Sequence, residues 1–155
     1  SLKIKNYFMR KKNAYIFIIF SIFIFQTIKA ENSFSLKEYL EKENIKETST
    51  QIYLLNRCSA IYAYSSAIIL KTDVNNSKKF IEIANNLLFK SVELRIIDDK
   101  EKLENAQKKA EDEREKIFKK YILDGKKNWD NNKSYFKGSY ISEDMLICEK
   151  LVNDK

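Results

Sequence analysis

The chain has 155 residues, no histidine, no proline and only two glycines, and its 29 basic and 22 acidic side chains give a net charge of +7. The lack of histidine removes the usual general base, the usual partner of a serine or cysteine nucleophile, and the commonest zinc ligand. Strand-rich folds need many turns, which draw on glycine and proline, so this composition favours long helices instead.

The N-terminal residues have the order of a secretory signal peptide. A basic stretch at 9–12 precedes an apolar run at 14–25, and the following polar residues end on Ala30. We therefore expect residues 1–30 to be upstream residues followed by a leader that starts at Met9. Residues 31–155 would then be a single helical domain. An uncleaved membrane anchor stays open as an alternative, although the apolar run is shorter than the roughly 20 residues of a spanning helix.

Removal of this leader would change the charge balance of the chain. Six of the 29 basic residues and none of the 22 acidic residues lie in 1–30, so residues 31–155 carry 23 basic and 22 acidic side chains, a net charge of +1. Binding to nucleic acid phosphates needs a net basic face. We therefore expect no nucleic-acid partner, and membrane contact only through the leader if it is not cleaved.

The first half of the domain predicts two helices. Ser35 and Glu38 have the spacing of a capping box, which starts a first short helix that runs to about residue 47. Residues 48–50 offer a second N-cap, and 51–71 predict a second helix. Residues 58–70 contain no charge. A run this short fits a buried central helix better than a membrane span.

A third helix is predicted to follow, with Asn76 or Ser77 as its N-cap. No helix breaker occurs between 77 and 124, so one long helix or two remain open. We favour a turn at 98–99, where an aspartate could cap a fourth helix, because a single long helix would leave its far half without a partner. Gly125 then predicts the C-terminal end of that fourth helix.

The last part of the chain predicts an irregular segment at 126–141 and a final helix capped by Ser142. Together these elements predict an all-α bundle of four or five helices, closed by one disulfide. The chain has two cysteines, Cys58 and Cys148, on the apolar faces of the second and last helices. In an exported protein they are expected to form a disulfide. Two buried thiols, or a redox pair, are the alternatives.

Arg57 interrupts an apolar helix beside Cys58, and a buried arginine needs a carboxylate. Asp144 lies one helical turn before Cys148, so a disulfide would bring it near Arg57. We expect Arg57 and Asp144 to form a structural ion pair, with a role in a ligand pocket as the alternative.

The segment 126–141 holds the candidate binding residues. Its aromatic side chains alternate with lysines, and we expect the binding surface to include Trp129, Tyr135, Phe136, Tyr140 and Lys133. The alternative is that these aromatics only fix an irregular loop to the bundle. Alternating oxygen ligands at 128–134 lack the central glycine and the final glutamate of a calcium loop. We therefore expect no metal and no cofactor.

These observations predict an exported, non-catalytic binding or interaction protein, located in the periplasm or secreted, whose partner is a protein or a cell-envelope polymer. The alternative is a small periplasmic hydrolase-like enzyme that uses carboxylates without histidine. An enzyme needs a concave pocket with several convergent polar groups, whereas an interaction protein needs an exposed aromatic or apolar patch.

Overall fold

The computed structural model describes residues 35–153, and this part of the chain contains five helices and no strand. The predicted all-α bundle closed by a disulfide is thus confirmed. The predicted leader that starts at Met9 lies outside the described residues. The helices are α2 (Leu36–Lys42), α3 (Thr48–Ile69), α4 (Val74–Ile97), α5 (Leu103–Asn132) and α6 (Tyr140–Asn153).

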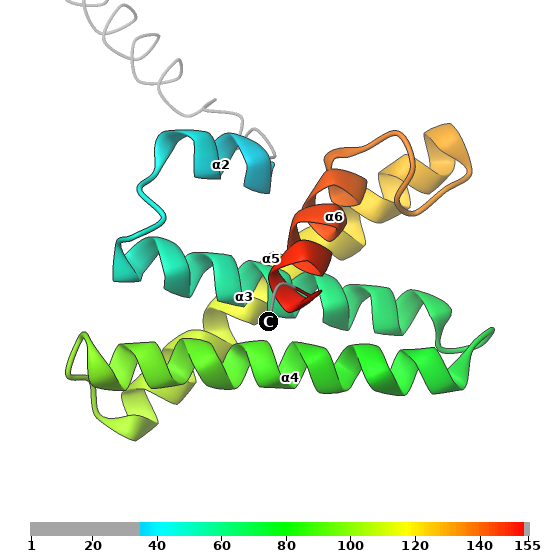
Figure 1. Cartoon of the computed structure of the whole chain (residues 1–155). Coiled ribbons are helices and arrows are strands. Elements are labelled where there is room, and N and C mark those ends of the chain that lie inside the picture. The colour runs from blue at the N-terminus through cyan, green and yellow to red at the C-terminus, as the bar shows by residue number, and fades with distance from the viewer. Residues whose placement is uncertain (1–34, 154–155) are drawn as a thin grey trace, which may run out of the picture. The chain divides into compact units, whose positions relative to one another are not determined.

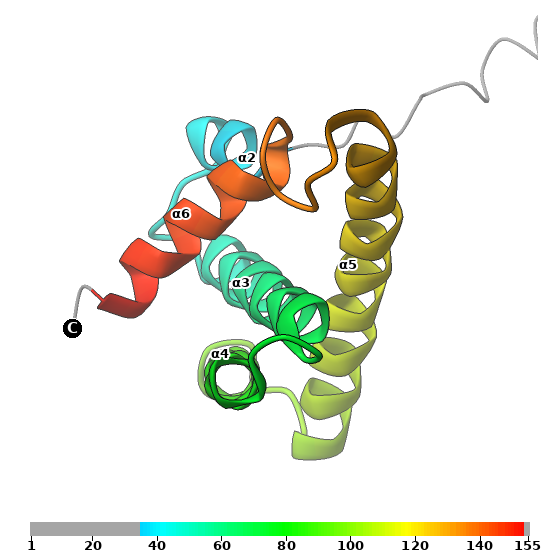
Figure 2. The same ribbon diagram turned by 90° about the vertical axis from the view of Figure 1, so that its right-hand side faces the viewer.

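Helix α3 lies at the centre of the described domain. It runs antiparallel to α4, while α2 and α6 lie on the side of α3 opposite to α4 (Figure 1). Helix α5 crosses both α3 and α4 and stands beside them in the view of Figure 2. This central position explains why α3 is apolar nearly all round.

Serines allow α3 and α4 to approach closely. The Ser66 hydroxyl donates to the Ser77 carbonyl at 2.8 Å, and the Ser77 hydroxyl donates to the Ser66 carbonyl at 3.0 Å. Two turns away, Ser59 donates to the Ala84 carbonyl at 2.7 Å. Each buried hydroxyl therefore has a backbone acceptor across the interface, which removes the penalty for burying it.

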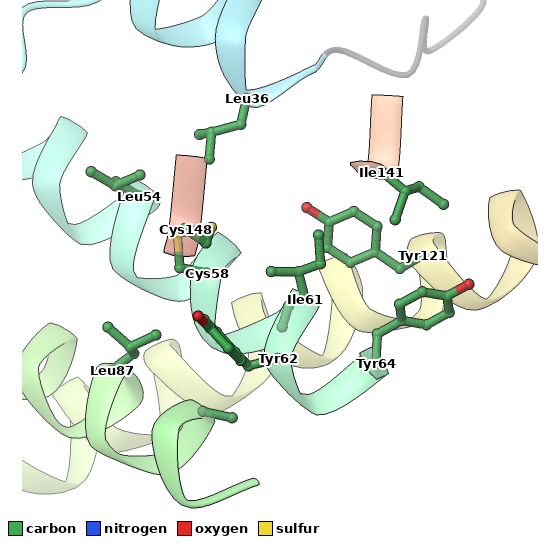
Figure 3. Close-up of a cluster of buried hydrophobic side chains, with 12 residues drawn as sticks. Leu36, Leu54, Cys58, Ile61, Tyr62, Tyr64, Leu87, Tyr121, Ile141 and Cys148 are labelled. Atoms are coloured by element: carbon green, nitrogen blue, oxygen red, sulfur yellow. A yellow bond between two sulfur atoms is a disulfide. The ribbon is translucent and has the colours of Figure 1, made fainter. Parts of the chain in front are cut away.

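The hydrophobic core collects side chains from all five described helices around α3 (Figure 3). Its fully buried members include three large side chains of α3, α5 and α6: Tyr64, Tyr121 and Ile141. Leu36 from α2 is also fully buried. None of the helices within residues 35–153 combines the length and apolar character that crossing a bilayer requires.

The predicted capping box at the start of α2 is confirmed. The Ser35 hydroxyl accepts from the Glu38 amide at 3.2 Å, and the Glu38 carboxylate accepts from the Ser35 amide at 3.3 Å. The helix ends at Lys42, earlier than predicted. The predicted cap of α3 is wrong, because Thr48 is already helical and the N-cap residue, Glu47, makes no side-chain capping bond.

The cap of α4 also differs from the prediction. Asp73 is the N-cap, and its carboxylate accepts from the Asn76 amide at 3.0 Å, so neither Asn76 nor Ser77 has this role. The predicted turn near 98–99 is confirmed, since α4 ends at Ile97 and α5 begins at Leu103. No aspartate caps α5, whose N-cap is Lys102. Asp98 instead ends α4 and accepts from the Thr48 hydroxyl at 2.9 Å.

The prediction that Gly125 ends the fourth helix is wrong. Helix α5 continues to Asn132, and Gly125 is buried within it. A Cβ atom at this position would overlap the hydroxyl of Tyr64 on α3. The glycine therefore allows a close approach of two helices, and the left-handed residue that ends α5 is Lys133, with a φ of 55°.

The predicted irregular segment is consequently shorter than 126–141, because α5 ends at Asn132 and α6 begins at Tyr140. Ser142 lies inside the first turn of α6 instead of capping it, and its hydroxyl donates to the Ser139 carbonyl at 2.9 Å.

Candidate functional site

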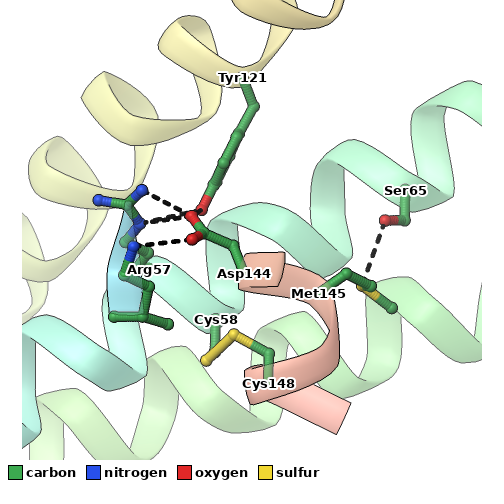
Figure 4. Close-up of a disulfide and its surroundings, with 8 residues drawn as sticks. Arg57, Cys58, Ser65, Tyr121, Asp144, Met145 and Cys148 are labelled. Atoms are coloured by element: carbon green, nitrogen blue, oxygen red, sulfur yellow. Dashed lines mark hydrogen bonds and ion pairs between the residues drawn. A yellow bond between two sulfur atoms is a disulfide. The ribbon is translucent and has the colours of Figure 1, made fainter. Parts of the chain in front are cut away.

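Cys58 on α3 and Cys148 on α6 form the predicted disulfide (Figure 4). Their Cα atoms are 5.3 Å apart, and they are separated by 90 residues in the sequence. Both residues are completely buried. A buried disulfide between two core helices has the position of a structural cross-link.

Arg57 and Asp144 lie directly beside this disulfide and form the expected ion pair. The Arg57 Nη2 is 2.5 Å from Asp144 Oδ2, and its Nε donates to the same oxygen at 2.9 Å. The side chains are 7% and 0% exposed. The disulfide and the ion pair therefore fasten α6 to α3 at the same place.

Further hydrogen bonds satisfy the Asp144 carboxylate. Its Oδ1 accepts from the Leu36 amide at the start of α2 at 2.7 Å, and its Oδ2 accepts from the Tyr121 hydroxyl of α5 at 2.6 Å. One carboxylate thus joins four helices. Both oxygens of Asp144 are therefore occupied by hydrogen bonds from the protein itself. We interpret Asp144 as a structural group and not as a general base.

Three tyrosines surround the guanidinium of Arg57. It lies 5.7–5.9 Å from the ring centres of Tyr53, Tyr121 and Tyr140, and its Nη1 donates to the Tyr53 hydroxyl at 2.7 Å. Burial by itself lowers the pKa of Arg57, but the neighbouring Tyr121 hydroxyl and Asp144 carboxylate outweigh it and raise that pKa above its ordinary value. Arg57 therefore stays positively charged in the interior, as the ion pair requires.

A second polar cluster joins α3, α4 and α5, and the sequence did not predict it. Arg95 is buried, and its Nη2 donates to the Glu113 carboxylate at 2.7 Å. Asn56, also buried, donates to the same oxygen at 2.6 Å. Glu113 lies in a highly charged stretch of the sequence, where nothing local marks it as a partner of buried residues. Only the crossing of α5 over α3 and α4 brings it to these partners.

The candidate binding residues separate into exposed and packed groups. Trp129 is 43% exposed, and its ring stacks on Tyr135 with centres 4.7 Å apart and planes at 22°. Phe136 packs on Tyr64 of the core, with ring centres 5.4 Å apart. Tyr140 stacks on Tyr121 at 6.1 Å. Phe136 and Tyr140 therefore anchor the segment, while Trp129 and Tyr135 form an aromatic pair with its outer ring exposed.

Asn128 fixes the connection between α5 and α6, a role that sequence reasoning missed. Its buried amide donates to the carbonyls of Ser134 and Lys137, both at 2.8 Å. The Ser134 hydroxyl accepts from the Lys137 amide at 2.9 Å. The Tyr64 hydroxyl donates to the Tyr135 carbonyl at 3.2 Å. The loop beneath the exposed tryptophan is thus held in one conformation before any partner binds.

Lysines flank the exposed tryptophan. Lys126 lies three residues before Trp129, on the same side of α5, and Lys133 is the residue that ends this helix, four residues after Trp129. Both lysines are exposed, and neither forms an ion pair with a carboxylate of residues 35–153. We call Trp129, Tyr135, Lys126 and Lys133 the Trp129 surface. Such a surface can combine stacking with attraction of anionic groups.

No group of three or more acidic or cysteine side chains in the described part of the chain has the geometry to hold a metal ion. Comparison with models of protein families, with curated proteins and with solved structures finds no match for this chain. The geometry of the chain itself is therefore the basis for any functional proposal.

Proposed function

We propose that the protein is an exported, non-catalytic binding module that contacts a protein or a cell-envelope polymer through the Trp129 surface. The observation that carries this proposal is the exposed tryptophan stacked on Tyr135 above a loop that Asn128 holds rigid. Exposed aromatic rings supply a large contact area at low cost in conformational entropy. A rigid scaffold lowers that cost further.

One concave feature of the described domain supports binding more than catalysis. A groove of about 280 Å³ lies between α3, α4 and α6, and six of its nine lining residues are apolar. Glu93 is the one carboxylate among them. An enzyme that works with carboxylates needs several convergent polar groups. This groove offers an apolar wall instead.

The proposed location is the periplasm or the extracellular space. The disulfide between Cys58 and Cys148 supports it, because such bonds persist in oxidising compartments. The sequence order of residues 9–30 supports export by a cleaved leader. N-terminal sequencing of the protein expressed with its leader should find a start at or near Glu31. A full-length cytosolic product would contradict this part of the proposal.

The binding proposal is tested by the substitution Trp129→Ala. The protein is mixed with the isolated cell-envelope fraction of a bacterial host, and the bound fraction is measured by co-sedimentation over a range of protein concentrations. We expect Trp129→Ala to weaken binding by at least about tenfold, the effect of losing a central aromatic anchor. Thermal stability should change little, because the side chain is substantially exposed.

Leu123→Ala is the matched control. Leu123 lies on the same helix and is 62% exposed, but it is not part of the Trp129 surface. Its substitution should leave binding unchanged. If Trp129→Ala instead lowers the free energy of unfolding by about 3 kcal/mol or more, as for a buried aromatic, Trp129 belongs to the core and the proposed surface is wrong.

A further inference from the structure

The segment that carries the Trp129 surface differs from the rest of the domain in its charge. Residues 126–137 contain four lysines and one acidic residue, Asp130, so their net charge is 4 − 1 = +3. The other described residues, 35–125 and 138–153, contain 18 basic and 19 acidic side chains, so their net charge is 18 − 19 = −1. A polyanion is therefore attracted to this segment, while the rest of the domain offers it no net positive charge.

The lysines of this segment are available to such a partner. All four are exposed, and none of them forms an ion pair with a carboxylate of residues 35–153. Lys126 and Lys133 are seven residues apart with Trp129 between them, a separation of about 10 Å along α5. A partner with repeated anionic groups can therefore contact both lysines at once, one on each side of the indole ring.

The indole ring adds a flat apolar surface between these charges. Tyr135 is stacked on it, with planes at 22°, and Trp129 is still 43% exposed. One face of a sugar ring consists of C–H groups, which pack against the exposed part of an aromatic ring. Exposed polar side chains directly follow the ring in the sequence, namely Asp130, Asn131 and Asn132. Such groups can bond to sugar hydroxyls.

Other anionic partners fit this surface less well. Lysine is depleted in the contact surfaces of folded proteins, whereas lysines flank Trp129 here. Insertion of the ring into lipid hydrocarbon would remove the neighbouring Asp130 and Asn131 from water, which is costly. Single-stranded nucleic acid also combines stacking with negative charge, but the proposed location outside the cytoplasm separates the protein from it.

We propose that the Trp129 surface binds an anionic sugar polymer. Trp129 stacks on one sugar ring, and Lys126 and Lys133 bind carboxylate or phosphate groups on either side of that ring. This inference rests on the proposed function and names the chemical class of its partner.

The test uses the fluorescence of Trp129, which is the only tryptophan of the chain and therefore reports binding at this surface directly. The protein is titrated in calcium-free buffer with polygalacturonate, a polymer with one carboxylate on each sugar. We expect a saturable change in emission and a dissociation constant that rises with salt. Dextran, a neutral sugar polymer, and polyglutamate, an acidic polymer without sugar, should each bind at least about tenfold more weakly, because each offers one of the two contacts.

Charge variants locate the contact. Lys126→Gln and Lys133→Gln should each raise the dissociation constant by about threefold or more and reduce its dependence on salt. Lys90→Gln is the matched control, because it removes the same charge from an exposed lysine of α4. The Trp129 surface lies at the end of α5 that is remote from α4 (Figure 2). Trp129→Ala, followed by calorimetry, should bind at least about tenfold more weakly with an unchanged circular dichroism spectrum.

Several outcomes would overturn the proposal. Equal binding of polyglutamate and polygalacturonate would show attraction by charge alone. Tighter binding of oligothymidylate, or of vesicles that contain phosphatidylglycerol, would assign the surface to nucleic acid or to lipid. If Trp129→Ala loses binding to cell envelopes but polygalacturonate does not bind, the proposed function stands and this inference fails. If Trp129→Ala binds cell envelopes as the parent does, the proposed function itself fails.

Discussion

Arg57 on α3 and Asp144 on α6 form an ion pair from which water is excluded, although 87 residues separate them in the sequence. Opposite charges in the interior attract strongly, but each has also lost its hydration. The hydrogen bonds from Leu36 and Tyr121 to Asp144 offset part of that loss. Removal of one partner would leave the other charge buried and unpaired. The ion pair is therefore expected to affect stability mainly through that penalty.

Asp144→Asn should lower the free energy of unfolding by about 3–5 kcal/mol, because it leaves the Arg57 guanidinium buried without a counter-charge. Urea denaturation of the two proteins measures the difference. The double variant Arg57→Met/Asp144→Asn should cost less than the sum of its single variants by about 1–3 kcal/mol. A loss below about 1 kcal/mol in Asp144→Asn would show that the charges are not coupled.

Stability should decrease at alkaline pH through the buried tyrosines. Burial raises the pKa of Tyr64, Tyr121 and Tyr140 above the ordinary value of 10.0. Above pH 10 the unfolded chain therefore loses these protons while the folded chain keeps them, which favours unfolding. Stability should be constant from pH 7 to 9, begin to fall near pH 10, and fall above pH 10 by about 1.4 kcal/mol per pH unit for each such tyrosine.

Tyr64→Phe is the control for this pH dependence. It removes one of the titrating groups and should therefore reduce the slope above pH 10 by about 1.4 kcal/mol per pH unit. Denaturation with urea at pH 7, 9, 10.5 and 11 measures the slope. A stability that remains constant through pH 11 would contradict the burial of these hydroxyls.

Removal of the disulfide should have a large effect through the unfolded state. Cys58→Ala/Cys148→Ala opens a loop of 90 residues, for which the chain-entropy relation gives about 4–5 kcal/mol. Guanidinium denaturation with and without a reductant should show the same difference for the parent protein. Mass spectrometry of the unreduced protein should find a cross-linked peptide that contains both cysteines. Free thiols in the protein isolated under oxidising conditions would contradict the pairing.

Gly125→Ala should destabilise the protein even though alanine is the better helix former. Its Cβ would overlap the hydroxyl of Tyr64, which is fully buried and cannot withdraw into solvent. We expect a net loss of about 1–3 kcal/mol in thermal or urea denaturation. In a Tyr64→Phe background the same substitution should cost about 1 kcal/mol less, because the closest of the overlapping atoms is gone. An equal loss of stability in both backgrounds would show that the Tyr64 hydroxyl is not the cause of the destabilisation.

The features that the sequence predicted correctly depend on local patterns or on simple counts. Ser35 and Glu38 cap α2 through hydrogen bonds between near neighbours, so their spacing of three residues is enough to predict the cap. Cys58 and Cys148 allow only one intramolecular pairing. Arg57 and Asp144 each lie next to one of these cysteines, and the pairing therefore brings them together.

The predictions that failed depended on distant neighbours. A glycine that ends a helix and a glycine that admits a neighbouring side chain look the same in a sequence, and Tyr64 lies 61 residues before Gly125. In the candidate site, the sequence could not show that Trp129 is exposed while Phe136 is partly buried, because both are aromatic residues in one polar stretch. The cross-helix contact of Phe136 with Tyr64 decides between them.

The bond from the Leu36 amide to Asp144 spans 108 residues and has a consequence for the order in which the domain is assembled. A polypeptide leaves the ribosome with its N-terminal residues first, so α2 emerges long before the helix that holds it. Until α6 has been synthesised, α2 can keep the ring contact of Tyr39 with Tyr53 on α3 but lacks the bond from Leu36 to Asp144. A chain interrupted before α6 would lack the counter-charge of Arg57 and the cover of Leu36, and we expect it to be less stable and more easily cleaved by proteases than the complete chain.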